Sequence, residues 1–293
     1  MPDLLVTAPA SSANLGPGFD CMAVALELRN EVELSLGGAP GVRVEIEGEG
    51  AGEAPADEHN LFVRAFAAAG GRVDGLDVSM RNRVPFARGL GSSAAAICAG
   101  VASARAMAGA DPAGALAEAA ALEGHPDNAA AALLGGVTLA WTAGDGPRSL
   151  RLPSCPVEFV AVIPPSTLAT DVARAALPQS VSHREAAHTA ARAALLVAAL
   201  ALGRTDLIAD ALDDRLHEPY RAPLVPLLAA TRLAAAGRAL GVTLSGAGPA
   251  VLVWCEPGSS AATAAVLDGL DGASALALAV ADRGVTVERT HAS

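Results

Sequence analysis

The chain has 293 residues, of which 52% are hydrophobic and 17% are charged, and its formal net charge is −11. This composition predicts one large folded domain or two modest ones and excludes a disordered chain. The negative charge disfavours nucleic acid and anionic membrane surfaces as partners, since both attract basic proteins.

All 20 cationic side chains are arginines, because the sequence contains no lysine. This excludes an enzyme that forms a Schiff base through lysine, and it excludes the lysine-dependent P-loop of the common nucleoside triphosphatases. Any phosphate site in this chain must therefore use backbone amides, hydroxyl groups, a metal ion or arginine.

The cysteines are scattered and show no spacing typical of a metal site: Cys21, Cys98, Cys155 and Cys255. Free thiols in a reducing compartment fit this pattern. The start MPDLLVTAP lacks a basic segment followed by an apolar core, so no signal peptide is expected. Apolar runs such as 193–203 are shorter than the roughly 20 residues that cross a bilayer. We expect a cytoplasmic protein without a membrane partner, and a homodimer is one option for its assembly.

Hydrophobic periodicity predicts the elements of the first half in chain order. Strands are predicted at 4–8, 31–36, 42–47, 76–80 and 137–141, and helices at 61–69, from Ser92 to about 108, at 112–122 and from a start within 125–128 to Gly135. The turn-rich segment 145–153 is the expected domain boundary. It divides the chain into residues 1–150 and 151–293.

The second half begins with a predicted strand at 157–163. Helices are predicted at 184–202, 207–212 and 224–239, and strands at 241–244 and 251–254 with a glycine turn between them. Strands and helices are mixed without a strict βαβ alternation, which indicates the α+β class.

The segment 85–96, PFARGLGSSAAA, combines a Gly-x-Gly pair with two serines at a helix start. Glycines let the backbone approach a ligand, and a helix N-terminus offers unpaired N–H groups and about half an elementary positive charge. This arrangement can hold phosphate without a lysine. On the segment alone, a tight turn with Ser92 as an ordinary N-cap is supported about equally well.

The segment 9–20, PASSANLGPGFD, contains Asn14, Phe19 and Asp20. Its Gly-Pro-Gly sequence predicts a compact loop that directs Asn14 and Asp20 to the same side. Taken alone, the segment favours a turn between strands, with Asp20 as a capping residue.

The segment 123–128, EGHPDN, carries two carboxylates. Glu123 could hold Mg²⁺ jointly with a serine hydroxyl, since Mg²⁺ prefers one or two carboxylates together with phosphate oxygens. Asp127 or Asn128 could face an acceptor hydroxyl. The alternative is that Asp127 caps a helix that starts at Asn128 and that His125 packs against the loop.

The segment 244–250, LSGAGPA, is a second glycine-rich turn. It could close over a triphosphate or only connect two strands. These four segments together resemble the GHMP kinases in their order and approximate spacing, over nearly the whole chain. The EGHPDN form is more similar to the homoserine kinase family than to mevalonate or galactose kinases, which usually carry a lysine near the first motif.

The resemblance implies a two-domain GHMP kinase fold, with a ribosomal protein S5 domain 2-like N-terminal domain, a ferredoxin-like C-terminal domain and ATP between them. It places Asn60 near the adenine. The implied phosphate loop consists of Pro85, Phe86, Ala87, Arg88, Gly89, Leu90, Gly91, Ser92, Ser93, Ala94 and Ala95. Ser93 and Glu123 are the implied Mg²⁺ ligands and, with Asn128, the implied catalytic residues.

Homoserine is a zwitterion, so its site needs an anion and a fixed cation. The residues that the resemblance implies for this site are Asn14, Asp20, Asn128, Thr170, Arg174 and Arg221. Asp20 suits the ammonium group, and Arg174 and Arg221 suit the carboxylate because a guanidinium binds it through two parallel hydrogen bonds. Arg215 competes with Arg221 for this role.

The implied activity is transfer of the ATP γ-phosphate to the side-chain hydroxyl of L-homoserine, which gives O-phospho-L-homoserine in threonine biosynthesis. Asp127 is interpreted as a helix cap and not as a base. Two alternatives are another GHMP kinase that acts on an isoprenoid alcohol or a sugar, and a catalytically silent member that binds nucleotide. The set of Asp20, Arg174 and Arg221 argues against the first, and retention of Ser93 and Glu123 argues against the second.

Overall fold

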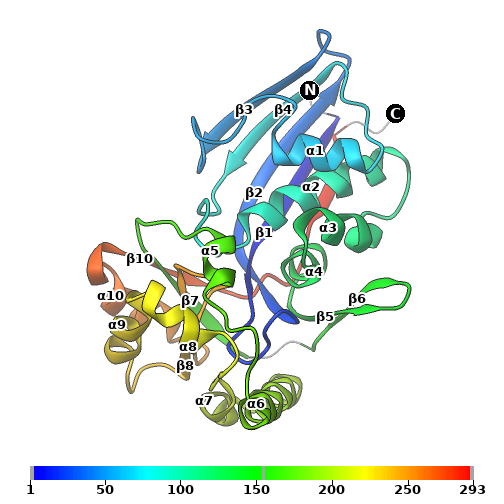
Figure 1. Ribbon diagram of the computed structural model, residues 1–293. Coiled ribbons are helices and arrows are strands. Elements are labelled where there is room, and N and C mark those ends of the chain that lie inside the picture. Colours follow the sequence, from blue (N-terminus) through cyan, green and yellow to red (C-terminus); the bar gives the residue numbers. More distant parts are fainter. Residues whose placement is uncertain (1–2, 154–155, 291–293) are drawn as a thin grey trace.

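The computed structural model describes residues 3–153 and 156–290, which form two β-sheets with helices packed against them (Figure 1). The strands are β1 (Leu4–Ala13), β2 (Met22–Leu36), β3 (Val42–Gly48), β4 (Leu76–Asn82), β5 (Val137–Ala143), β6 (Gly146–Arg151), β7 (Glu158–Ile163), β8 (Gly241–Leu244), β9 (Val251–Cys255), β10 (Ser274–Leu278) and β11 (Thr286–Arg289).

The α-helices are α1 (Leu61–Ala68), α2 (Ser92–Met107), α3 (Leu116–Glu123), α4 (Pro126–Leu134), α5 (Thr170–Ala175), α6 (His183–Leu202), α7 (Ile208–Ala211), α8 (Glu218–Arg221), α9 (Leu227–Ala234) and α10 (Ser260–Leu267). Short 3₁₀ helices are η1 (Pro112–Ala115), η2 (Thr205–Leu207), η3 (Ala222–Leu224) and η4 (Leu270–Gly272). The predicted α+β class is confirmed, since parallel and antiparallel strands occur together with these helices.

The larger sheet has seven strands in the order β11-β1-β2-β4-β3, and β5 pairs with both β2 and β6. β3 and β4 are parallel and are connected through α1, whereas the other pairs are antiparallel. Alternate apolar residues of β1, β2 and β4 pack against α1 and α2, which cover one face of the sheet (Figure 1). β11 returns from the C-terminal half to pair with β1.

The smaller sheet is antiparallel, with the order β10-β7-β9-β8. One face packs in a core with α6 and α7 through Phe159 and Trp254, whose rings meet edge to face at 4.9 Å. The other face packs on α9 and α10 through Val160 and Val253. Because both faces are buried, β7 and β9 consist of nearly continuous apolar runs, which made both strands predictable.

Three predicted elements differ in detail from those observed. The segment 145–153 contains strand β6, antiparallel to β5, where a loop was expected. Helix α4 begins at Pro126, within the predicted opening, and not at Asn128 as the interpretation of Asp127 as a cap required, because proline suits the first helical turn, where its missing N–H would have no partner. The helix predicted at 224–239 is shorter, since η3 precedes it and α9 ends at Ala234.

Among the residues that the structure describes, α6 is the one helix long and apolar enough to cross a membrane by length and composition, with a mean hydropathy of 1.3. The apolar run 193–203 is only part of this helix, because α6 begins ten residues before it, at a capping box between Ser182 and Glu185. Leu196 and Leu200 of α6 are buried in the core that contains Trp254. One such helix is weak evidence for a membrane span.

Three of the cysteines, at positions 21, 98 and 255, are free thiols, while Cys155 lies outside the described residues.

Glu218 connects the short helix α8 to the smaller sheet. Its two carboxylate oxygens accept hydrogen bonds from the Leu244 backbone N–H and from Arg232, both at 2.6 Å. Burial raises the pKa of this carboxyl to about 7, against the opposing effect of Arg232. The group therefore holds a proton in the folded chain at pH values where the unfolded chain has lost it.

This pKa difference predicts a loss of stability as pH rises. The unfolded chain releases the Glu218 proton near pH 4.5 and the folded chain near pH 7, so the contribution of this group to the free energy of unfolding falls across that window. Glu218→Gln removes the titrating group and should show a smaller decline in Tm between pH 5 and pH 8 than the native protein. Glu256→Gln, at an exposed position, is the control that should keep the native decline. Equal declines in all three proteins would contradict this account.

Candidate active site

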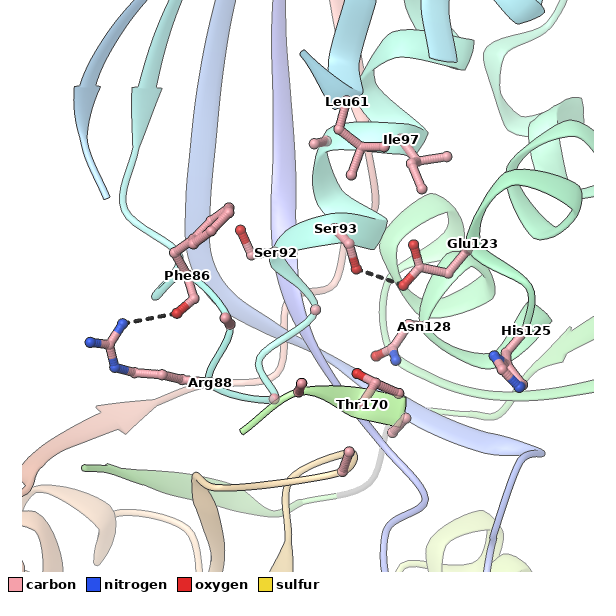
Figure 2. A pocket seen from close by; sticks show the side chains of 18 of the residues that line it. Leu61, Phe86, Arg88, Ser92, Ser93, Ile97, Glu123, His125, Asn128 and Thr170 are labelled. Atoms are coloured by element: carbon pink, nitrogen blue, oxygen red, sulfur yellow. Dashed lines mark hydrogen bonds between the residues drawn. The ribbon is translucent and has the colours of Figure 1, made fainter. Parts of the chain in front are cut away.

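A cavity of about 720 Å³ lies where the two halves of the chain meet, and each of the four sequence motifs contributes to its wall. Figure 2 shows apolar side chains, Leu61 and Ile97, at one end and polar ones, Asn128 and Thr170, at the other. The volume falls within the roughly 300–1,000 Å³ of small-molecule sites. The cavity therefore combines an apolar compartment with a polar one.

The loop between β4 and α2 forms one wall. Of its predicted phosphate-binding residues, the cavity is lined by Phe86, Ala87, Arg88, Gly89, Gly91, Ser92 and Ser93, whereas Pro85, Leu90, Ala94 and Ala95 are buried and do not line it. Gly91 is the N-cap of α2 with φ +67°, and no side chain caps this helix. The interpretation of Ser92 as N-cap is therefore wrong, and the first N–H groups of α2 stay available for an anion.

Close packing beneath the loop explains its glycines. A Cβ on Gly91 would overlap the Ser11 hydroxyl, and a Cβ on Gly89 would overlap the Ser245 carbonyl. The Ser245 hydroxyl donates to the Gly89 carbonyl at 2.7 Å, and the Ala250 N–H donates to the Arg88 carbonyl at 3.2 Å. The segment 244–250 thus forms the turn between β8 and β9, one of its two interpretations, and supports the loop from below.

Ser93 and Glu123 lie together, as Figure 2 shows, with the Ser93 hydroxyl donating to Glu123 Oε1 at 2.7 Å. They come from the first turn of α2 and the last residue of α3. Burial raises the pKa of the Glu123 carboxyl, and the Ser93 hydrogen bond opposes this shift. The described residues contain no group of three or more His, Cys, Asp or Glu that could hold a metal alone. One carboxylate and one hydroxyl fit Mg²⁺ that takes its other ligands from phosphate and water.

A bidentate ion pair joins Asp20 to Arg174 at the polar end, with Arg174 Nη2 2.8 Å from Asp20 Oδ1 and Nη1 3.2 Å from Oδ2. Asn14 holds Asp20 in place, because its Oδ1 accepts from the Asp20 backbone N–H at 3.1 Å. Asn14 Nδ2 donates to the Gly246 carbonyl at 2.8 Å, so both polar ends of the amide are used within the protein. The predicted loop that directs Asn14 and Asp20 to one side is confirmed.

Arg221 lies beside this pair and is only 2% exposed. Its guanidinium lies 5.2 Å from the Phe19 ring centroid and donates to His217 Nδ1 at 3.2 Å and to the Ala173 carbonyl at 3.3 Å. Because His217 Nδ1 accepts from the Arg221 guanidinium while Nε2 donates to the Gly16 carbonyl, the imidazole is neutral, and burial lowers its pKa in agreement.

Arg221 and Thr170 line the cavity, whereas Arg215 is not among its lining residues and lies 3.6 Å from Asp213 in an ion pair. Of the two arginines that compete for the predicted carboxylate role, the structure brings Arg221 to the cavity. Neither His217 nor its stack with Phe19, with ring centroids 5.0 Å apart, could be found from the sequence, since a buried histidine beside a loop has no characteristic spacing.

Asn128 and Asp127 lie in the first turn of α4. Asn128 Oδ1 accepts from the Ser11 hydroxyl at 2.9 Å, which leaves its amide nitrogen for a ligand in the cavity. The interpretation of Asp127 as N-cap was wrong, because His125 occupies that position. Asp127 instead accepts from the Asn128 backbone N–H at 2.7 Å, and burial, with a contribution from Asp20, raises the pKa of its carboxyl.

Asn60 also lines the cavity, and its side chain is the N-cap of α1. Its Oδ1 accepts from the Phe62 N–H at 3.0 Å, and its Nδ2 donates to the Pro55 carbonyl at 2.8 Å. Asn60 therefore shapes the apolar compartment through the position of α1. Ala96 and Ile97 also line this part of the cavity and were not singled out from the sequence, because small apolar helix residues look like ordinary core.

Two family models match the chain: the GHMP kinases N terminal domain over residues 60–136 and the GHMP kinases C terminal over residues 196–266. The homoserine kinase of Streptomyces coelicolor is 43% identical, and the alignment covers 96% of this chain and 93% of that protein. The homoserine kinase of Moorella thermoacetica is 43% identical over 86% of this chain and 87% of its own length.

Solved structures show the same fold. The crystal structure of homoserine kinase from Cytophaga hutchinsonii superposes with a TM-score of 0.86 at 29% identity and covers 98% of both chains. The phosphomevalonate kinase of Streptococcus pneumoniae superposes with a TM-score of 0.69 at 14% identity, covering 99% of both chains, which shows the fold alone. The predicted two-domain fold is confirmed.

The packing beneath the loop predicts the effect of Gly91→Ala. The added Cβ would displace Ser11 or the loop, so the KM for nucleotide should rise about tenfold. Alanine at positive φ should also lower the stability by about 1–2 kcal/mol through backbone strain. Gly109→Ala is the matched control, since Gly109 has φ +74° with no atom within 4 Å of a Cβ. It should lose similar stability and keep the native KM. A native KM in Gly91→Ala would show that the loop tolerates displacement.

Proposed function

Because the chain belongs to the GHMP kinases and, within them, to the homoserine kinase family, we propose that it transfers the γ-phosphate of ATP to the side-chain hydroxyl of L-homoserine. The product is O-phospho-L-homoserine. The observation that carries the proposal is the pairing of Asp20 with Arg174 beside the buried Arg221 at the polar end of the cavity. These charges complement an amino-acid zwitterion.

The nucleotide occupies the apolar compartment and the loop beside it. Its base lies near Leu61, Phe86 and Ile97, and its phosphates lie on the backbone of the loop before α2, where the N-terminal N–H groups of the helix carry partial positive charge. Ser93 and Glu123 would hold Mg²⁺, and the ion would supply positive charge that offsets the charge developing on the transferred phosphate.

The acceptor lies at the polar end. Asp20 binds its ammonium group, and Arg174 and Arg221 bind its carboxylate. In the ligand-free protein Asp20 and Arg174 neutralise each other. When a zwitterion binds, its ammonium pairs with Asp20 and its carboxylate pairs with Arg174, so neither side chain is left as an unpaired charge. An acceptor with a single charge, or a neutral sugar, leaves one of them without a partner. This selects for the zwitterion.

Catalysis follows from positioning and charge neutralisation, because the transition state of phosphoryl transfer is loose and needs little help from a base. The Asn128 amide nitrogen orients the acceptor hydroxyl, and the Ser11 hydroxyl fixes the amide. Asp127 accepts a hydrogen bond from the Asn128 N–H, and burial disfavours its charged form, which raises its pKa. The acceptor proton leaves to the transferred phosphate or to solvent.

The biological setting extends this proposal. O-phosphohomoserine formation places the protein in threonine biosynthesis, and the absence of metal-type cysteine spacing fits a reducing cytoplasm. A homodimer stays a prediction. A second candidate is a GHMP kinase that acts on an isoprenoid or sugar alcohol, and its acceptor would leave the Asp20–Arg174 pair without a counterpart.

The substrate proposal predicts a clear order of turnover. In a coupled assay of ADP release with Mg²⁺ and ATP, homoserine should be phosphorylated at least a hundredfold more efficiently than mevalonate, galactose or shikimate, because these acceptors lack one or both charges. The uncharged analogue 1,4-butanediol is the control that keeps a terminal hydroxyl and removes both charges of the zwitterion. Turnover of mevalonate equal to that of homoserine would overturn the proposal.

Arg174→Ala tests the carboxylate site. Loss of a charge-assisted bidentate contact should weaken homoserine binding by about 2–4 kcal/mol, while the KM for ATP stays near its native value. Arg215→Ala is the matched control, because Arg215 does not line the cavity and should leave both constants unchanged. A rise in the ATP constant as steep as that for homoserine would assign Arg174 to the nucleotide site.

A further inference from the structure

Arg88 belongs to the phosphate loop, yet its guanidinium bonds to backbone carbonyls on two separate segments. Nη1 donates to the Phe86 carbonyl of its own loop at 2.9 Å, a bond that Figure 2 shows. Nε donates to the Pro164 carbonyl and Nη2 to the Pro165 carbonyl, both at 3.1 Å. The guanidinium therefore donates hydrogen bonds both to its own loop and to the segment that follows β7.

The charge and shape of this contact suit a fixed connection. A guanidinium presents five donors in a rigid plane, and a lysine ammonium could not reach three carbonyls in this arrangement. The Arg88 side chain is only 23% exposed, and Glu49 Oε2 lies 3.9 Å from Nη1 and accepts from the Phe86 N–H. Arg88 is therefore held on the loop side as well.

The segment beyond Pro165 leads directly into the acceptor site. Leu168 packs against the core between the smaller sheet and α9, and Leu168, Thr170 and Arg174 line the cavity. α5 begins at Thr170, and its Arg174 carries the ion pair to Asp20. Arg88 therefore connects the phosphate loop to a segment that ends only five residues before the start of α5.

We propose that Arg88 is a positioning residue that couples nucleotide on the phosphate loop to the placement of α5 and its Arg174. When the loop closes on phosphates, the guanidinium holds residues 164–169 in register with it, so Arg174 is presented to the acceptor. The coupling uses the nucleotide site of the proposed function and does not depend on the identity of the acceptor.

Amide hydrogen exchange of the full chain, with and without Mg²⁺ and a non-hydrolysable ATP analogue, tests this coupling. In the native protein the nucleotide should slow exchange at 87–95 and also at 166–175. Arg88→Gln, which keeps a polar side chain but cannot reach all three carbonyls, should keep the slowing at 87–95 and lose it at 166–175. Arg88→Ala should do the same, and Arg88→Gln covers the case in which the alanine variant does not fold.

Arg83→Ala is the matched control, because Arg83 precedes the same loop and pairs with Glu31 of β2, within the larger sheet. It should keep the slowing at both segments. A second measurement compares the Kd for homoserine with and without the ATP analogue. The native protein should bind homoserine at least about fivefold more tightly when the analogue is bound, which is the lower end of typical coupling. In Arg88→Gln the two Kd values should be nearly equal.

Slowing at 166–175 that persists in Arg88→Gln, or that is absent from the native protein, would overturn the coupling. A tenfold loss of analogue affinity in Arg88→Gln with the slowing intact would also overturn it, and would make Arg88 a phosphate ligand. If homoserine is not phosphorylated but the exchange pattern is as expected, the coupling stands and the proposed substrate is wrong.

Discussion

A hydrogen bond of 2.7 Å from the Ser245 hydroxyl to the Gly89 carbonyl holds the phosphate loop against the turn between β8 and β9. Because the chain contains no lysine, a phosphate site here depends on backbone N–H groups, hydroxyl groups, a metal ion or arginine. The N–H groups can contribute only if the loop keeps its shape. That shape requires a left-handed backbone at Gly89 and Gly91, which glycine adopts without strain, and Ser245 from the other half of the chain holds it in place. The two sheets are thereby joined at the floor of the cavity.

Several charged side chains around this floor are buried at an energetic cost. Burial raises the pKa of Glu123 and Asp127, which means that the protein carries carboxylates in surroundings that disfavour their charge. A bound cation relieves this cost at Glu123. At the polar end of the cavity, Arg221 is buried beside Arg174, and an anionic ligand would relieve the repulsion between the two guanidinium groups. Local instability of this kind is typical of functional sites, where ligand binding supplies the missing charge.

The sequence predicted the long and strongly patterned elements well, because β7 and β9 are apolar on both faces and α2 is a continuous run of small residues. It missed α5, α8 and β11, which have few residues and no clear period, and it also missed α10 and β10. Most residues that the motifs singled out line the cavity, whereas Pro85, Leu90, Ala94 and Ala95 are buried and do not line it. The motifs could not predict that Arg88 faces Pro164 and Pro165, since that contact joins positions 76 and 77 residues apart.

The most direct test is a crystal structure of the protein with Mg²⁺, a non-hydrolysable ATP analogue and L-homoserine. The account predicts Mg²⁺ at about 2.0–2.1 Å from oxygens of Ser93 and Glu123. It also predicts the homoserine ammonium on Asp20 and the carboxylate on Arg174 and Arg221, with the Asp20–Arg174 pair opened. A homoserine carboxylate away from both arginines, or an intact ion pair beside bound homoserine, would contradict it.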